Sequence, residues 1–257
     1  MKDTSEMKIT IGHLYPDLLN LYGDRGNIAC MMQRCLWRGI RAETIEFHTG
    51  EYIDFSKLDI VLLGGGSDRE QLIVCQNLKK IQRQFQEFVE DNGVVLAVCG
   101  GYQLLGRYYR TGAGMIEGLN LLDIYTEQEE GRLIGNIILD SDLAHIPVVG
   151  FENHGGRTCI NGCRPFGRVL YGEGNDGRSG CEGVIYKNVI GTYLHGPLLP
   201  KNPQICDHLL KKALERKYGT AGLEKLDDNL ERAANAYICK RFLPGGSMHC
   251  RQMDLVH

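Results

Sequence analysis

The sequence lacks the features that would place the chain in a membrane or on nucleic acid. No apolar run is long enough to span a bilayer, and the N-terminal stretch MKDTSEMKITIGHLY has no apolar segment typical of a signal peptide. The formal charge is -3 and the pI is about 6.2, so no basic surface for nucleic acid is indicated. We therefore expect a cytoplasmic protein with no nucleic-acid partner.

Signatures of metal and nucleotide binding are also missing. None of the ten cysteines forms a Cys-x-x-Cys pair, and Cys159 and Cys163 have no matching second pair, so we expect reduced thiols and no metal site. The phosphate-binding pattern G-x-x-x-x-G-K-[ST] does not occur. Gly172, Gly174 and Gly177 formally match a dinucleotide-binding pattern, but Asn-Asp-Gly within it is typical of a hairpin turn and no helix is expected after it.

Short apolar segments alternate with amphipathic ones in the first half of the chain. The pattern predicts strands over 8–14, 41–48, 58–63 and 94–98, and helices over 27–38, 68–91 and 102–105. Ser67 or Asp68 is expected to cap the helix that starts near 68. Nearly continuous apolar strands that alternate with helices predict an α/β fold, with a doubly wound, mostly parallel sheet and helices on both faces.

The second half of the chain is less regular. It predicts strands over 131–139 and 148–151, a hairpin or two short strands over 184–194, and helices over 202–217 and 228–242. No repeat and no linker interrupts the chain, so we expect a single domain over residues 1–242. The segment 243–257 has little periodicity and is expected to be a disordered tail.

The stretch from Gly93 to Gly106 carries the strongest chemical signal. A β-branched apolar run ends at Cys99, Gly100 and Gly101 follow, and a helix is predicted next. A strand that ends in a nucleophile and turns sharply into a helix is a nucleophile elbow, here with Cys in place of Ser. The glycines permit the tight turn and the close approach of a substrate carbonyl. The alternative is a buried core cysteine, but the flanking pattern favours a nucleophile.

A cysteine nucleophile needs a base, and parallel sheets bind ligands at the carboxyl ends of their strands. His195 follows an apolar strand there, and we expect it to be the base. His154, in a glycine-rich loop, is the alternative, and either could instead be a loop histidine bonded to its neighbours. The N–H of Gly100 is expected to stabilise the oxyanion, with a second donor from the loop Gly64–Gly66. That loop could also be only a helix-entry turn or an anion nest.

Five segments together carry a resemblance to a known family. They are LYGDRGNI at 21–28, GGGSDREQ at 64–71, CGGYQ at 99–103, GFENHGGRT at 150–158 and GTYLHGP at 191–197. In this combination the chain resembles the cobyric-acid-synthase-like branch of the class I glutamine amidotransferases, and within it the glutaminase subunits of lipid II isoglutaminyl synthase. The resemblance implies a class I amidotransferase-like fold. It also implies that Cys99 attacks the side-chain amide of L-glutamine with His195 as base, so that ammonia leaves and water then releases glutamate.

The resemblance also implies further site residues. The broader class often orients the base with a His-x-Glu element, but Pro197 stands two positions after His195. The resemblance implies Asp24 in place of that carboxylate. It also implies that Arg132 acts in glutamine binding or gating; a guanidinium can fork onto an α-carboxylate, and the alternative is a surface arginine. The expected substrate site is completed by Gly65, Gly66, Gly100 and Gln103.

Amidating a carboxylate requires ATP, and this chain has no nucleotide motif. The acceptor chemistry must therefore lie on another protein. The resemblance implies MurT, a Mur-ligase-like subunit that uses ATP to activate the D-glutamate α-carboxylate of lipid II and then receives ammonia. We expect no cofactor in this chain and a heterodimer that acts in peptidoglycan synthesis. A stand-alone cysteine amidase and an inactive amidotransferase-like regulatory module are the alternatives; the presence of Cys99 and His195 argues against the second.

Overall fold

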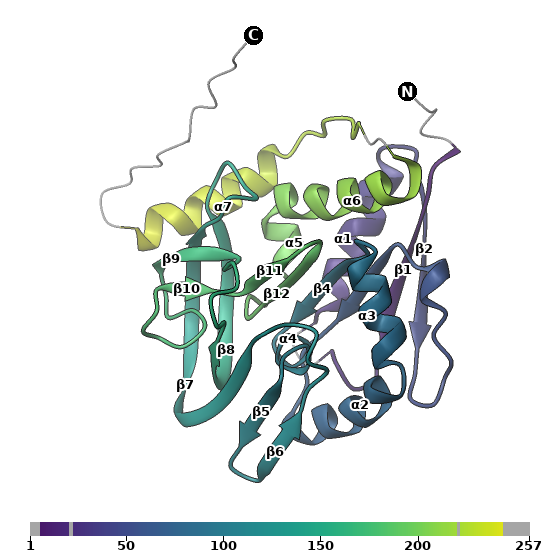
Figure 1. The fold of residues 1–257 in the computed structure, drawn as a ribbon. Helices are drawn as coiled ribbons and strands as arrows, with labels where there is room; N and C mark the ends of the chain where they lie inside the picture. The colour runs from purple at the N-terminus through teal and green to yellow at the C-terminus, as the bar shows by residue number, and fades with distance from the viewer. Residues whose placement is uncertain (1–5, 21–22, 220–221, 244–257) are drawn as a thin grey trace.

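Two six-stranded sheets form the framework of the computed structural model, which describes residues 6–20, 23–219 and 222–243 (Figure 1). Apart from Leu243, the predicted tail 243–257 lies outside the described residues. Two isolated bridges join segments of the two halves of the fold, Phe151 with His195 and Arg164 with Ile185. The sheets therefore adjoin, and the Phe151 bridge places His195 at their junction.

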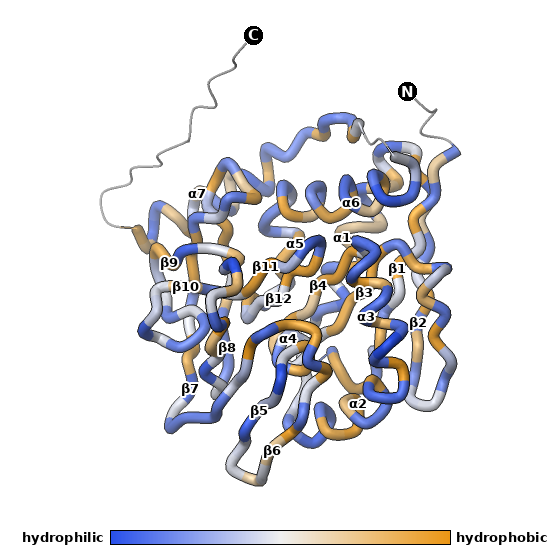
Figure 2. Tube along the Cα trace, in the orientation of Figure 1, coloured by the Kyte–Doolittle hydropathy of each residue, from blue (hydrophilic) through white to orange (hydrophobic). Residues whose placement is uncertain are grey.

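The first sheet contains the predicted parallel strands. Its order is β11-β12-β4-β3-β1-β2, and only β11 runs antiparallel to its neighbour. The strands are β1 (Lys8–Leu14), β2 (Arg41–Phe47), β3 (Ile60–Leu63), β4 (Val94–Val98), β11 (Val184–Tyr186) and β12 (Val189–Thr192). Every residue of β3 and β4 is buried, as expected for apolar strands with helices on both faces. Hydrophobic colours accordingly concentrate along these central strands in Figure 2.

Helices cover this sheet in a doubly wound arrangement. From β1 the chain steps outward to β2 through α1 (Arg25–Leu36), and from β3 it steps the other way to β4 through α2 (Asp68–Lys80) and α3 (Gln82–Glu90). Right-handed crossovers in opposite directions place these helices on opposite faces, which confirms the predicted fold class. The helix predicted over 68–91 is two helices, because the backbone leaves the helical conformation at Ile81 (φ -117°, ψ 13°).

The second sheet was not predicted. It has the order β10-β9-β7-β5-β6, with β8 paired to β7, and all of its pairings except β5 with β7 are antiparallel. Its strands are β5 (Tyr108–Thr111), β6 (Gly114–Glu117), β7 (Tyr125–Asp140), β8 (Val148–Cys159), β9 (Gly167–Tyr171) and β10 (Cys181–Glu182). The strands predicted over 131–139 and 148–151 are parts of the longer β7 and β8. Polar residues occupy buried positions along β8, so its alternation does not appear in a hydrophobicity pattern.

Short and C-terminal helices complete the fold. They are η2 (Phe55–Lys57), α4 (Gly100–Leu104), α5 (Leu198–Lys201), α6 (Pro203–Tyr218) and α7 (Asn229–Phe242), and the last two confirm the predicted C-terminal helices. In Figure 1, α7 lies along the upper end of the second sheet, where Cys239 packs with Ile138 and Val149 in a small separate core. The helix α7 is therefore anchored on β7 and β8.

A buried arginine links three helical segments. Arg34 of α1 is 2% exposed, and its Nε and Nη2 each donate to one carboxylate oxygen of Asp207 in α6 at 2.7 Å. Its Nη1 donates to Asp228, immediately before α7, at 2.6 Å. Arg38 also donates to Asp207 at 2.7 Å. Since burial of an unpaired charge is costly, this network ties α6 and the start of α7 to α1.

We expect Arg34→Met to lower the free energy of unfolding by about 3 kcal/mol, because Asp207 and Asp228 would lose their principal partner while remaining partly buried. Urea unfolding followed by circular dichroism measures this loss. Arg83→Met is the matched control, because Arg83 is 89% exposed on its side chain and forms only a helical-surface pair with Glu87. The control should change by less than about 0.5 kcal/mol. Equal losses in the two variants would contradict the structural role of Arg34.

Candidate active site

The elbow predicted at Cys99 is present at the carboxyl end of β4. Cys99 has φ 51° and ψ -106°, a strained conformation for a residue with a side chain, and it is 7% exposed. Its N–H donates to the Thr192 carbonyl (2.8 Å), and the Gly101 N–H donates to the Gly64 carbonyl (3.0 Å). A Cβ at Gly101 would lie 2.7 Å from Leu63, so only glycine lets α4 start this close to β3. The turn therefore holds the thiol at the edge where β3, β4 and β12 end.

Asp24 and His195 meet beside this thiol. The Asp24 Oδ1 lies 3.9 Å from the His195 Nδ1, and both side chains are almost completely buried. The other Asp24 oxygen, Oδ2, accepts the N–H of Gly65 at 2.8 Å. A Cβ at Gly65 would lie 3.1 Å from the Cys99 Cβ and 3.2 Å from the His195 Cε1. The three expected catalytic side chains thus converge around one glycine.

The backbone fixes the position of His195, and the neighbouring charged groups set its protonation state. Its N–H donates to the Phe151 carbonyl at 2.8 Å and its carbonyl accepts the Phe151 N–H at 3.3 Å, so β8 holds the residue from one side. Burial lowers the pKa of His195, but the interactions with Asp24 and Cys99 outweigh it and raise the pKa from 6.5 to about 9. The imidazole of His195 is therefore mostly protonated at neutral pH.

His154, the alternative base, is placed differently. Its ring stacks on Tyr193 with a centroid distance of 3.6 Å and an interplanar angle of 5°. Its Nδ1 donates to the Gly156 carbonyl at 2.7 Å, which assigns the proton to that nitrogen. His154 lines the same cavity as Cys99, but Asp24 faces His195. The arrangement therefore favours His195 as the base and His154 as part of the cavity wall.

A cavity of about 440 Å³ opens onto Cys99, and we refer to it as the Cys99 cavity. It is lined by Gly66, Ser67, Asp68, Arg69, Gln71, Cys99, Gln103, Tyr109, Arg132, His154 and Gly155. Arg132 is fixed at its mouth by Asn153, which accepts from Nε through Oδ1 and from Nη2 through its carbonyl, each at 2.9 Å. Gln103 is buried and donates from Nε2 to the Tyr193 hydroxyl at 3.1 Å. The expected substrate residues Arg132, Gly66 and Gln103 thus share one cavity with the thiol.

The expected oxyanion donors divide into two kinds. Gly100 is the first residue of α4, where an N–H has no partner within the helix. The Gly65 N–H is committed to Asp24, so this glycine serves the orientation of the carboxylate. Gly66 lines the cavity, and no hydrogen bond of its N–H is found within the described residues. Gly100 and Gly66 are therefore the pair of backbone donors suited to an oxyanion.

Several site residues were not singled out from the sequence. Gln71 is 2% exposed, donates to the Gly66 carbonyl at 3.2 Å and occupies the space that a Cβ at Gly100 would need. The sequence did contain a signal for it: Gln71 lies four residues after Ser67, one helical turn into α2, and so on the same face of the helix as the capping residue. The hydroxyl of Tyr193 is hydrogen-bonded to that of Thr158 (2.6 Å), which is in turn hydrogen-bonded to that of Thr126 (2.8 Å). Nothing in the local pattern distinguishes this chain of hydroxyls from an ordinary core.

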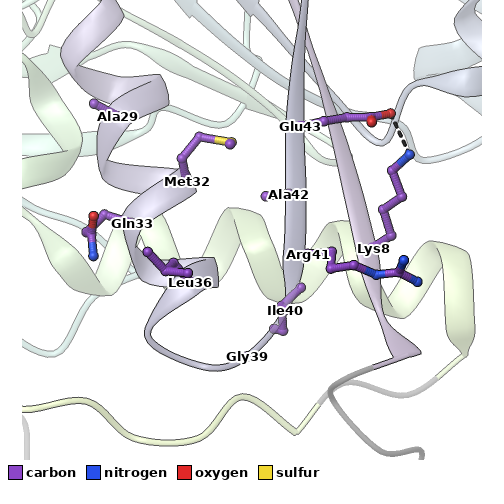
Figure 3. A pocket seen from close by; sticks show the side chains of 10 residues that line it. All are labelled: Lys8, Ala29, Met32, Gln33, Leu36, Gly39, Ile40, Arg41, Ala42 and Glu43. Atoms are coloured by element: carbon purple, nitrogen blue, oxygen red, sulfur yellow. Dashed lines mark ion pairs between the residues drawn. The ribbon is translucent and has the colours of Figure 1, made fainter.

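A larger cavity lies elsewhere and has a different character. It measures about 620 Å³ and lies between α1 and the edge strand β2 (Figure 3). Apolar side chains such as Met32, Leu36 and Ile40 line it, together with the ion pair of Lys8 and Glu43 at 2.7 Å. It holds no nucleophile and no histidine, so size alone does not identify the site of chemistry.

Metal and membrane sites are not found in the described part of the chain. Across residues 6–20, 23–219 and 222–243, no group of His, Cys, Asp and Glu could hold a metal ion, and the cysteines are free. None of the helices in these ranges has the length and apolar character needed to cross a membrane.

A cysteine in a strained strand-to-helix turn, with a histidine and a carboxylate beside it, is typical of α/β enzymes that cleave carbonyl substrates through a thioester. The sequence places the chain more narrowly. The model of the CobB/CobQ-like glutamine amidotransferase domain matches residues 10–203, and the chain belongs to that family.

Individual relatives agree with this assignment. The chain is 45% identical to the lipid II isoglutaminyl synthase (glutamine-hydrolyzing) subunit GatD of Staphylococcus aureus, over 91% of this chain and 96% of the relative. It is 40% identical to the GatD subunit of Streptococcus pneumoniae, over 82% of this chain and 83% of the relative. A solved structure described as a glutamine amidotransferase shares the fold, with a TM-score of 0.53 and 18% identity over 79% of this chain and 98% of that one.

We expect the His195 ring to titrate near pH 9 and Asp24→Asn to lower its pKa, because burial persists while the carboxylate charge is lost. NMR titration of the histidine Cε1 protons measures this. The raised pKa also means that the contribution of His195 to folding stability is complete below about pH 6.5 and is lost as the pH rises through about 9. Asp17→Asn, which removes an exposed carboxylate beside His48, should leave the His195 titration in place. A pKa unchanged by Asp24→Asn would contradict the pairing.

Proposed function

We propose that this chain is the glutaminase subunit of a glutamine-dependent amidotransferase that amidates lipid II. The observation that carries the proposal is the 45% identity, over 91% of the chain, to a subunit named for that activity. The convergence of Cys99, Asp24 and His195 around Gly65 supports it, because it supplies a nucleophile, a base and an orienting carboxylate in one place.

The geometry suits a two-step hydrolysis of the side-chain amide of L-glutamine. His195 holds the proton removed from the Cys99 thiol, and the sulfur attacks the amide carbon. The tetrahedral intermediate collapses to a thioester as His195 returns the proton to the departing nitrogen, which leaves as ammonia. Water, activated by His195, then attacks the thioester carbon, so that glutamate leaves and the thiol is restored. Each proton that His195 takes is given back within the same half-reaction.

Two further groups stabilise the charges that develop in these steps. The N–H groups of Gly100 and Gly66 point to an oxyanion hole, and one such donor is worth roughly 3 to 4 kcal/mol in the transition state. The Asp24 carboxylate orients His195 and stabilises its imidazolium form, in the role that the absent His-x-Glu carboxylate has in the broader class. The Asp24 Oδ1 lies 3.9 Å from the His195 Nδ1, so the carboxylate acts on the imidazolium mainly through its charge.

Substrate recognition is assigned to the walls of the Cys99 cavity. Arg132, held by Asn153, presents a guanidinium for the α-carboxylate of glutamine. Gln103, held by Tyr193, lies in the wall near the reacting amide. No cofactor is assigned to this chain.

The ammonia acceptor belongs to a second subunit in this proposal. The two relatives are each named as one subunit of a synthase, so that synthase has at least one more subunit. We assign the second role to a MurT-like, Mur-ligase-like partner that uses ATP to activate the D-glutamate α-carboxylate of lipid II, which ammonia then converts to D-isoglutamine. Lipid II is thus reached only through the partner. The need for ATP places the reaction on the cytoplasmic side of the membrane.

Cys99→Ala is expected to abolish glutamine-driven amidation while the fold survives, because one thiol contributes little packing. The assay contains the full chain, the MurT-like partner, lipid II, ATP and glutamine, and mass spectrometry detects the amidated product. With Cys99→Ala, product should form only when ammonium is supplied. Product formed from glutamine by Cys99→Ala would overturn the proposal. Glutamate release by the wild type with no amidation under any condition would favour a stand-alone amidase.

Release of glutamate from glutamine distinguishes the roles of His195 and His154. His195→Ala should lose nearly all activity because the ring of His195 lies beside Cys99 and faces Asp24, whereas His154→Ala should retain a measurable rate. The reverse order would assign the base to His154.

Asp24→Asn is expected to lower kcat with KM nearly unchanged, because orientation of His195 acts mainly on the transition state. Steady-state glutamate release measures both constants. A rise in KM alone would make Asp24 a glutamine-binding residue. An unchanged enzyme would indicate a Cys-His dyad.

A further inference from the structure

The Cys99 cavity has an asymmetric set of charges. Among its lining residues, Arg69 and Arg132 are cations and Asp68 is the one carboxylate. Asp68 is the first residue of α2, directly after the capping Ser67, whereas Arg132 extends from β7 in the other sheet. One wall of the cavity therefore carries a negative charge, and a wall built from a different element carries a fixed guanidinium.

The substrate assigned to this cavity carries the matching charges. L-Glutamine is a zwitterion at neutral pH, with an α-carboxylate and an α-ammonium on the same carbon. Arg132 accounts for the carboxylate, but a desolvated ammonium also requires an acceptor, and a charged acceptor is the most favourable. The Asp24 carboxylate does not line the cavity and is already held by Gly65 and His195. Asp68 is the remaining candidate.

The surroundings of Asp68 favour this role. Its Oδ1 accepts the Tyr109 hydroxyl at 3.4 Å, and Tyr109 is only 4% exposed. Burial, and then the charge of Asp68, raise the pKa of Tyr109, so the phenol stays protonated and can remain a donor. The tyrosine steadies one oxygen of the carboxylate and leaves the other for a ligand. In the described part of the chain no lysine or arginine forms an ion pair with Asp68, which distinguishes it from the paired surface carboxylates.

We propose that Asp68 binds the α-ammonium of L-glutamine and thereby selects α-amino acids over amides that lack an α-amino group. The inference rests on the proposed function, since it assigns a substrate contact within the same site. Asp68 takes no part in bond breaking. With Arg132 it fixes the α-carbon, so that the side-chain amide reaches Cys99 in one orientation.

The test compares L-glutamine with glutaramate, the same chain without the α-amino group. Hydrolysis of each by the full-length protein with its partner is followed as kcat/KM, with ammonia as the common product. Loss of a charge-assisted contact predicts that the wild type prefers glutamine on the order of 10- to 100-fold. In Asp68→Asn the preference for glutamine should fall to within about 3-fold. Glutamine loses its ammonium contact with residue 68, whereas glutaramate has no ammonium and never made that contact. Asp68→Glu should keep part of the preference, since it retains a carboxylate.

The controls separate binding from stability. Glu117→Gln removes an exposed carboxylate that pairs with Lys79 outside the cavity, and it should keep the wild-type preference. The loss of a negative charge at the start of α2 in Asp68→Asn can lower stability, but it would not change the ratio between two substrates. Thermal unfolding monitors stability in each variant.

Three outcomes would overturn the inference. The first is a wild-type enzyme that cleaves glutaramate as efficiently as glutamine. The second is an Asp68→Asn enzyme whose kcat/KM falls by the same factor on both substrates. The third is an Asp68→Asn enzyme that keeps the full wild-type preference for glutamine. In each case Cys99-dependent release of ammonia from glutamine would leave the proposed function intact. Absence of that release in the wild-type complex would instead count against the proposed function.

Discussion

The site depends on one buried carboxylate. Asp24 is fully excluded from solvent, and a charge in that position requires partners within the protein. It finds them in the Gly65 N–H and in His195, which come from the loop after β3 and the segment after β12. The start of α1, the glycine loop and the histidine are therefore held by a common interaction. If this carboxylate were displaced, the orientation of the base and the shape of the glycine loop would change together.

Close packing of backbone makes this convergence possible. A side chain at Gly64 would overlap the Leu19 carbonyl, one at Gly65 would crowd Cys99 and His195, and one at Gly101 would collide with Leu63. Glycine is required at these positions because neighbouring segments approach the backbone too closely to leave room for a side chain. The strained backbone of Cys99 belongs to the same constraint, since the thiol can reach the strand edge only through a turn this tight.

The second sheet converts an open strand edge into a cavity. β7 and β8 contribute Arg132 and His154 to its wall, and the bridge between Phe151 and His195 joins β8 to the segment after β12. In the same wall, Gln103 of α4 donates a hydrogen bond to the hydroxyl of Tyr193, which lies in the segment after β12. The parallel sheet thus positions Cys99 and His195, and the antiparallel sheet adds the opposite wall of the cavity.

The sequence by itself determined the parallel sheet and the strand-to-helix turn at Cys99, because both depend on local patterns: an apolar run over 94–98 between glycines, and a Cys-Gly-Gly turn into a helix. It did not reveal the second sheet, since polar residues of β8 such as Glu152 and Thr158 point inward and conceal the alternation of the strand. Only the tertiary structure decided that His195 rather than His154 faces Asp24, and that Gly65 serves the carboxylate while Gly66 remains available. These features depend on contacts between segments that are far apart in the chain. The packing of the fold sets the distances between those segments, and local residue spacing does not encode them.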